Sequence, residues 1–201
     1  MVHIKTLPVG EYQTNCYIVW GEDTDRCIVI DPGYEPKTIL QAANDAGKKI
    51  DSILLTHGHF DHVGGLRDLA HQTGCRIYLH RKEEMLPDSM TGGMLFYSNP
   101  YAEGDVLNMA GLSLTILHTP GHTPGSVCIA VEDVLFAGDT LFAGSIGRTD
   151  FPGGDVPDMK KSLARLGSLP VNYRVYPGHG EPTTIEQEKA QNPFLRGTIQ
   201  I

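Results

Sequence analysis

A cluster of side chains with high affinity for metals falls within one short segment of the sequence, THGHFDH. It contains His57, His59, Asp61 and His62. In an extended segment, residues two apart point to the same side, so His57 and His59 can reach one metal ion together. Asp61 and His62 follow after a further turn and point elsewhere, which suits a second metal beside the first. The segment therefore predicts a metal centre with room for two ions.

Three further candidate ligands lie in turns that follow or end strand-like segments. His122 lies in a turn flanked by glycines, Asp139 ends the run VLFAGD, and His179 lies between two glycines. The two carboxylate oxygens of Asp139 suit a position that bridges two metals. Imidazole and carboxylate ligands without thiolate favour Zn²⁺, Fe²⁺ or Mn²⁺ and argue against a structural zinc site built on cysteine. With a position left open for water, such a centre is catalytic.

Short apolar runs alternate with turn signals along the chain, and eight of them are expected to be strands. These runs are NCYIVW, RCIVID, SILLTH, RIYLH, LTILHT, VCIAV, VLFAGD and YRVYPGH. The segments with helical spacing of apolar residues are 35–47, 64–74, 156–169 and 183–191. In the last of these, Thr183 and Glu186 predict a capping box. This mixture predicts sheets covered by helices, with the candidate ligands in loops at one edge of the sheets.

Composition and charge narrow the classes of partner. The 201 residues predict one domain, and the formal net charge of −8 argues against a nucleic-acid partner or an anionic membrane. None of the four cysteines forms a C-x-x-C pair, so they are expected to be reduced core thiols. The N-terminus lacks the apolar segment of a signal peptide, and no apolar run approaches the ~20 residues of a membrane span. A cytoplasmic protein is therefore expected.

The segment 81–103 lacks a clear period. We interpret it as a long surface excursion of the kind that forms a lid or a dimer contact, which leaves a homo-oligomer open.

Four motifs occur in the order THGHFDH, PGHTPGS, FAGDTLF and PGHG, and together they resemble the metallo-β-lactamase superfamily. The extension GDTLFAGSIGRTDFPGG is similar to the glyoxalase II-like hydrolases, especially their short single-domain members. The resemblance implies an α/β fold, an αββα sandwich of two mixed β-sheets flanked by helices. It also implies a single domain over residues 1–201, without the helical C-terminal domain of full-length glyoxalase II-like enzymes.

The resemblance assigns the ligands position by position. It implies His57, His59 and His122 for a first metal, Asp61, His62 and His179 for a second, and Asp139 as a bridge between them. The two aspartates, Asp61 and Asp139, have an expected catalytic role as well as a ligand role. The implied cofactors are two divalent metal ions, with Zn²⁺ favoured and Fe²⁺ or Mn²⁺ compatible. His118 stands in a similar H-T-P-G frame but does not match the ligand position, so it is expected either to support a ligand from behind or to be structural.

The implied reaction is hydrolysis of a thioester such as S-D-lactoylglutathione by metal-activated hydroxide. A thiolate leaving group needs no general acid, because the pKa of a thiol is already low. The resemblance places a basic residue that holds a glutathione carboxylate near Arg148, and an ion pair with Asp150 is the equal alternative for that residue. Because the helical domain is not expected, a smaller or different thioester is also open.

Other functions remain open at this level. A persulfide dioxygenase shares the fold and uses one Fe²⁺, which here would be held by two of the three histidines 57, 59 and 122 together with Asp139. A hydrolase of lactones, other esters or β-lactams is a further alternative. The negative charge argues against a nuclease of the same superfamily. A scaffold without activity is disfavoured because the ligand set is complete.

Overall fold

Two six-stranded β-sheets form the centre of the computed structural model, which describes residues 1–199 and residue 201. The first sheet has the strand order β1-β2-β3-β4-β5-β6, and the second has the order β14-β13-β10-β9-β8-β7. The strands of the first sheet are β1 (His3–Val9), β2 (Thr14–Trp20), β3 (Arg26–Ile30), β4 (Lys49–Leu54), β5 (Arg76–His80) and β6 (Asn99–Tyr101). Those of the second are β7 (Val106–Met109), β8 (Leu112–His118), β9 (Val127–Val131), β10 (Val134–Gly138), β13 (Arg174–Pro177) and β14 (Thr183–Thr184). A separate small hairpin pairs β11 (Leu141–Phe142) with β12 (Ser145–Ile146).

Both sheets are mixed. In the first sheet β1, β2 and β3 pair antiparallel, whereas β3 to β6 pair parallel. In the second sheet β10 and β13 pair parallel, and the remaining pairs are antiparallel. Antiparallel neighbours are joined by turns or loops without helices, and the parallel pairs require longer connections, which here contain the helices.

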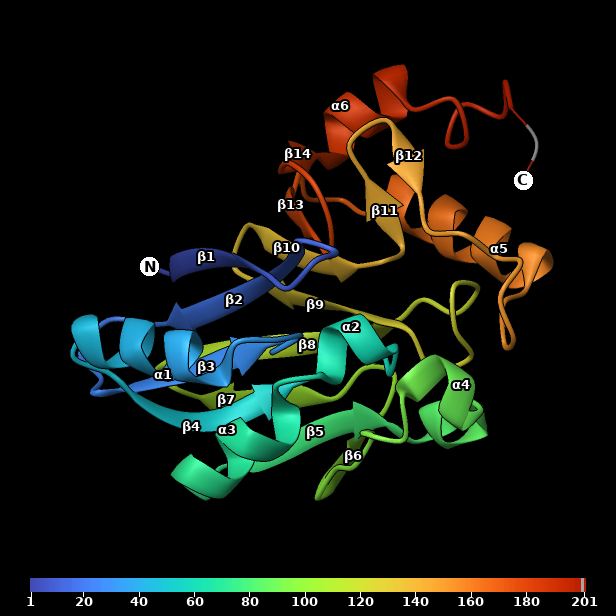
Figure 1. Cartoon of the computed structure of the whole chain (residues 1–201). Helices are drawn as coiled ribbons and strands as arrows, with labels where there is room; N and C mark the ends of the chain where they lie inside the picture. The colour runs from blue at the N-terminus through green and yellow to red at the C-terminus, as the bar shows by residue number, and fades with distance from the viewer. Residues whose placement is uncertain (200) are drawn as a thin grey trace.

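Three apolar clusters hold the layers together. One lies between the sheets, where Ile28 and Leu54 of the first sheet meet Ile129 and Phe136 of the second. Another packs α1 (Pro36–Asp45) and α3 (Leu66–Thr73) on the outer face of the first sheet. The third packs α5 (Val156–Gly167) and α6 (Ile185–Gln191) on the outer face of the second sheet. Figure 1 shows these two helix pairs on opposite sides of the molecule. The architecture is therefore the expected αββα sandwich.

Each of the eight runs expected to be strands contains one, and each of the four expected helices is present. The capping box is wrong by one residue. Thr184, rather than Thr183, is the N-cap of α6, and its hydroxyl accepts a hydrogen bond from the N–H of Gln187. Thr183 instead belongs to β14 and donates its hydroxyl to Glu188. The pairing of β14 with β13 therefore delays the start of the helix.

The segment 81–103 is less superficial than expected. It contains the 3₁₀ helix η1 (Arg81–Met85), the short helix α4 (Asp88–Thr91) and β6, the edge strand of the first sheet. Glu83 and Thr91 are buried within it. The sequence shows no period here because each element is too short to display one.

Cys16, Cys27 and Cys128 are buried, Cys75 is half-buried, and all four thiols are free. None of the helices within the described residues has the length and apolarity needed to cross a membrane.

Candidate metal centre

The candidate ligands come from loops at one end of the two sheets. Strands β10 and β13 run parallel with Gly138 opposite Pro177, so Asp139 and His179 leave neighbouring strands on the same side. The loop between β8 and β9 returns to that same end and carries His122. From the first sheet, the loop after β4 carries THGH, and α2 (Phe60–Val63) continues it. Strand pairing within each sheet and the packing of the two sheets together thus bring residues more than 100 positions apart into one site.

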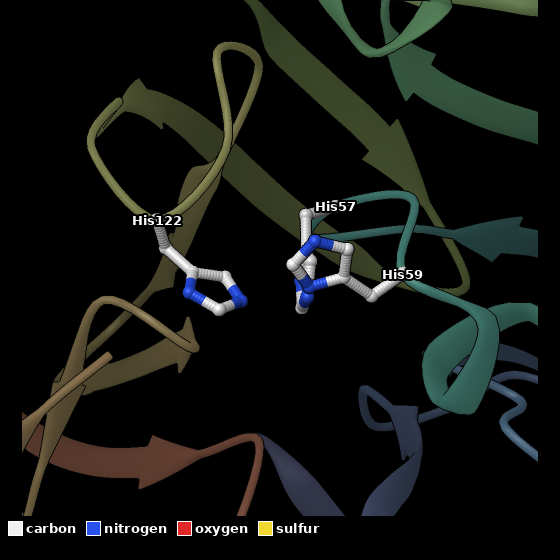
Figure 2. Close-up of side chains that lie close together, drawn as sticks. All are labelled: His57, His59 and His122. Atoms are coloured by element: carbon white, nitrogen blue, oxygen red, sulfur yellow. The ribbon is translucent and has the colours of Figure 1, made fainter. Parts of the chain in front are cut away.

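The first cluster joins the two sheets across this edge. Figure 2 shows His57 and His59, from the loop after β4, facing His122 from the loop between β8 and β9. The ring centroids of His57 and His59 lie 4.8 Å apart, and that of His122 lies 4.8 Å from the former and 4.6 Å from the latter. One nitrogen from each ring lies within 4.8 Å of the others, so the three can hold one metal ion.

The second cluster lies beside the first. Its ligand atoms, from Asp61, His62 and His179, also lie within 4.8 Å of one another. The Nε2 atom of His179 is 3.1 Å from Asp61 Oδ2, and that of His62 is 3.6 Å from the same oxygen. These three residues are the set expected for a second metal.

Asp139 lies between the two clusters. Its Oδ2 is 3.6 Å from the Nε2 atoms of both His122 and His179, and its Oδ1 is 3.4 Å from His62 Nε2. It therefore faces a histidine of the first cluster and two of the second. This is the position that a bridging carboxylate requires, and all seven expected ligands are brought together.

Buried polar atoms without hydrogen-bond partners are rare in folded proteins, because each costs free energy. Five of them meet here without a partner among the residues that the structure describes: Nε2 of His57, His59, His62 and His122, and Oδ1 of Asp139. All five belong to the expected ligand set. A metal ion would satisfy these atoms together, so the residues present fit a metal centre.

The opposite ring nitrogens are already engaged. In the first cluster, His57 Nδ1 lies 3.1 Å from Thr56 Oγ1, and His122 Nδ1 lies 2.8 Å from the carbonyl oxygen of Arg148. In the second cluster, His62 Nδ1 lies 2.9 Å from Asp31 Oδ2, and His179 Nδ1 lies 3.1 Å from the carbonyl oxygen of Tyr12. An oxygen acceptor at Nδ1 fixes the proton there and leaves Nε2 as the free electron pair. Such partners orient metal-binding histidines and raise their basicity.

Sequence reasoning missed Asp31 and Thr14. Asp31 is buried and directly follows β3, and the parallel pairing of β3 with β4 brings it to Thr56. Its Oδ1 accepts a hydrogen bond from the backbone N–H of Thr56 at 2.7 Å. Ligand atoms of Asp31, His57 and His62 also lie within 4.8 Å of one another, but Asp31 faces the hydrogen-bonded Nδ1 atom of His62. We therefore assign it an orienting role. Thr14 donates its hydroxyl to Asp61 Oδ2 at 2.9 Å.

Comparison with known proteins agrees with this geometry. The sequence model described as "Metallo-beta-lactamase superfamily" matches residues 9–179. The chain belongs to the metallo-β-lactamase superfamily. It is 37% identical to "Hydroxyacylglutathione hydrolase GloC" of Haemophilus influenzae, over 96% of this chain and 98% of that one.

Two solved structures are similar over nearly their whole length. The structure of "BLEG-1 B3 metallo-beta-lactamase" has a TM-score of 0.88 at 33% identity and covers 96% of this chain and 99% of its own. The structure of "TTHA1623 in a di-iron-bound form" has a TM-score of 0.84 at 37% identity, and the match covers 94% of this chain and 99% of that one. The fold and the His/Asp clusters of this superfamily member together indicate a divalent metal site.

The charges around the centre favour a cation. Burial lowers the pKa of His57 well below its ordinary value and that of His59 to about 3, so both rings are neutral, as metal binding requires. Burial also lowers the pKa of His62, but Asp139 and Asp31 outweigh it and hold that pKa well above the ordinary value. The site thus stabilises positive charge at the place where the second metal is expected.

A cavity of about 290 Å³ opens onto the centre. Five of the expected ligands contribute to its lining, and Tyr12, Phe60, Met90 and Phe151 form a largely apolar wall. No serine, threonine or cysteine occurs among the described residues that line it. A hydroxyl or thiol nucleophile from these residue types is therefore not offered to a bound substrate.

Arg148 also lines this cavity. Its guanidinium donates to both carboxylate oxygens of Asp150, at 2.7 and 2.8 Å, and lies 3.5 Å from the ring centroid of Phe151. The ion pair that the sequence offered as an alternative is thus present, and the same side chain stands at the cavity. His118 lies outside both clusters, where its Nε2 is 2.9 Å from the carbonyl oxygen of Pro124.

Proposed function

We propose that this superfamily member is a metal-dependent hydrolase of a small 2-hydroxyacyl thioester such as S-D-lactoylglutathione. The observation that carries the proposal is the group of five buried, unpartnered ligand atoms beside a cavity that His59, His122 and Asp139 line and whose described lining contains no nucleophile of the serine, threonine or cysteine type. The similarity to a protein named hydroxyacylglutathione hydrolase, over nearly the whole of both chains, supports the choice of substrate class.

The proposed centre holds two divalent ions, Zn²⁺ by preference, with the ligand division described above. When bound, the metals supply Lewis acidity and lower the pKa of water to about 7, so hydroxide is available at neutral pH. The chain's own task is to hold the ligands in place, exclude bulk water from the buried side and position the acyl group. Both aspartates are expected to be ionised for this purpose. Burial raises the pKa of both carboxyl groups. For Asp61 the hydrogen bond from His179 outweighs burial, and for Asp139 the nearby His62 does so, so both pKa values lie below the ordinary value.

The size and lining of the cavity support a small acyl group. A volume of about 290 Å³ lies at the lower end of the range for ligand pockets, so a whole tripeptide thioester would extend beyond it. The apolar wall suits the carbon skeleton of the acyl group. Arg148 stands where an extended thiol portion would pass, and we propose that it contacts a carboxylate there.

The free cysteines fit the proposed cytoplasmic setting. Burial raises the pKa of Cys128 to about 11 and that of Cys16 well above its ordinary value, so both stay protonated and unreactive.

The proposal is tested by following thiol release from S-D-lactoylglutathione with a thiol-trapping reagent, alongside elemental analysis of protein purified without added metal. We expect two metals per chain, thiol release that rises with pH near about 7, and loss of activity on chelation. Asp139→Asn is the matched inactive control. Hydrolysis of a β-lactam without thiol release from any thioester would contradict the proposal. One iron per chain, together with oxygen consumption when glutathione persulfide is added, would contradict the proposal and favour a persulfide dioxygenase.

A further inference from the structure

Glu83 is a fully buried carboxyl group that belongs to neither ligand cluster. It lies in η1, the short 3₁₀ helix that follows β5, and none of its surface is exposed. Burial raises the pKa of this carboxyl to about 7, against the lowering effect of the hydrogen bonds it accepts. A buried carboxylate is costly unless it is well hydrogen-bonded, so its partners show what it is there to hold.

The two oxygens of Glu83 accept hydrogen bonds from two different loops. Oε2 accepts from the backbone N–H of Gly58 at 2.6 Å, and Oε1 accepts from that of Gly125, also at 2.6 Å. Gly58 separates the first two histidines of the first cluster, and Gly125 lies three residues after the third histidine. One loop follows a strand of the first sheet and the other joins two strands of the second, so this single side chain ties the two halves of the first cluster together.

Both loops carry glycine at the point where the carboxylate meets them. A Cβ atom added to Gly125 would lie 2.7 Å from Glu83 Oε1, and one added to Gly58 would lie 3.1 Å from Oε2. The first distance is too short for any real side chain, and the second would require the neighbour to move. The two glycines therefore allow the carboxylate to approach the backbone, in addition to any conformational freedom they give the loops.

A backbone hydrogen bond also joins this region of the two sheets, from the N–H of Val127 to the carbonyl oxygen of Thr56 at 2.9 Å. Thr56 lies at the start of the first loop, before His57, and Val127 is the first residue of β9, beyond the end of the His122 turn. Glu83, in contrast, holds the backbone between two ligands on one side and the far end of the His122 turn on the other. Small changes in the separation of these loops would change the distance between ligand atoms directly.

We propose that Glu83 is a positioning residue whose carboxylate fixes the separation of the loops 56–59 and 119–126 and thereby sets the geometry of the first metal site. The inference rests on the metal centre proposed above but not on the thioester reaction. It also gives a role to the segment 81–103 that differs from the lid or dimer contact offered by the sequence.

The test is Glu83→Gln, with Glu84→Gln as the matched control. Glutamine has the same shape, but its amide nitrogen cannot accept a backbone N–H, so one of the two loops is released. Glu84 is the exposed neighbour, and its carboxylate accepts from the hydroxyl of Tyr97 instead. The probe is Co²⁺, bound to each variant in competition with a chromogenic chelator, with the visible absorption spectrum recorded at each step.

In Glu83→Gln we expect the affinity for one of the two ions to fall by about 10-fold, the lower end of the range for direct hydrogen-bond partners of metal ligands, because Glu83 acts on the ligands only through the backbone. The spectrum of that ion should change while the other ion keeps its affinity, and Glu84→Gln should match the wild type. If Glu83→Gln does not fold, Gly125→Ala is the second variant. It keeps the carboxylate but forces it away from the loop, and the same selective loss is expected.

Three outcomes overturn the inference. Wild-type affinity and spectrum in a Glu83→Gln protein of lowered melting temperature would assign Glu83 to folding alone. An equal loss of both ions would show that it does not act on the first site. If the wild-type protein binds no Co²⁺, the proposed metal centre itself is contradicted. That result is distinguishable from a failure of the role proposed for Glu83, which concerns only the variant. A wild-type protein that binds Co²⁺ but releases no thiol from a thioester would contradict only the proposed reaction.

Discussion

The carboxylate of Asp31 is connected to one histidine of each ligand cluster. Its Oδ2 lies 2.9 Å from His62 Nδ1 in the second cluster and accepts the hydroxyl of Thr56 at 2.6 Å. The oxygen of that hydroxyl lies 3.1 Å from His57 Nδ1 in the first cluster. Because both Nδ1 atoms are held by oxygen acceptors, both rings present Nε2 to the metal positions. One buried side chain therefore fixes the tautomer and orientation of two ligands.

Asp31→Asn is expected to weaken both metals by about 10- to 100-fold, because an amide nitrogen in place of Oδ2 would meet the donor at His62 Nδ1. Metal content after dialysis against a weak chelator measures the loss. Asp51→Asn is the matched control, since Asp51 makes ion pairs with Arg26 and Arg76 away from the site. Equal metal content in the two variants would show that Asp31 does not orient the ligands.

The two H-T-P-G histidines should behave differently. His122→Ala removes a ligand of the first cluster, so it should lose that metal and abolish turnover. His118→Ala should keep near wild-type metal content and lose activity only in part, because His118 stacks on His80 with ring centroids 4.3 Å apart and contacts the backbone. Elemental analysis beside the thiol-release assay distinguishes them. An empty centre in His118→Ala would reverse the assignment.

Much of the fold and the ligand set could be predicted because the signals are local. The motif THGHFDH places four candidate ligands in seven consecutive residues, and the strand runs are apolar and bounded by turns. β1 was missed because it is a largely exposed edge strand that contains Pro8. Its residues lack the continuous apolar run that marked the buried strands.

The residues that orient the ligands carry no comparable signal. Asp31 ends the run RCIVID much as Asp139 ends VLFAGD, but an aspartate after a strand is also an ordinary turn residue. Its partners Thr56 and His62 lie 25 and 31 positions away and are brought to it by pairing of β3 with β4. Glu83 stands beside Glu84 in the sequence, and only the fold buries the first and exposes the second.

Asp139→Asn is expected to weaken both metals, because Asp139 faces His122 of the first cluster as well as His62 and His179 of the second. Asp61→Ala should weaken mainly the second metal, since Asp61 clusters with His62 and His179 alone. Stepwise chelator titration of each variant resolves the two ions. Losses that are equal in the two variants would contradict the division of ligands between two sites.

Arg148→Ala tests the contact proposed with the thiol portion of the substrate. The side chain is exposed at the cavity, paired with Asp150 and stacked on Phe151. The carbonyl oxygen that accepts from His122 Nδ1 belongs to the backbone of Arg148, so this substitution leaves that acceptor in place and the metal content should not change. We therefore expect KM for a glutathione thioester to rise severalfold, with a smaller effect on kcat, because the contact is remote from the reacting carbonyl.

The matched variant for this prediction is Asp150→Ala. It releases the guanidinium from its present partner and leaves it free for a substrate carboxylate, so KM should fall or stay unchanged. Steady-state kinetics of both variants, with a glutathione thioester and with an uncharged thioester of the same acyl group, separate the two roles of Arg148. The effect of Arg148→Ala should be confined to the charged substrate. If KM rises equally for both substrates in both variants, the ion pair with Asp150 shapes the loop and Arg148 does not contact the substrate carboxylate.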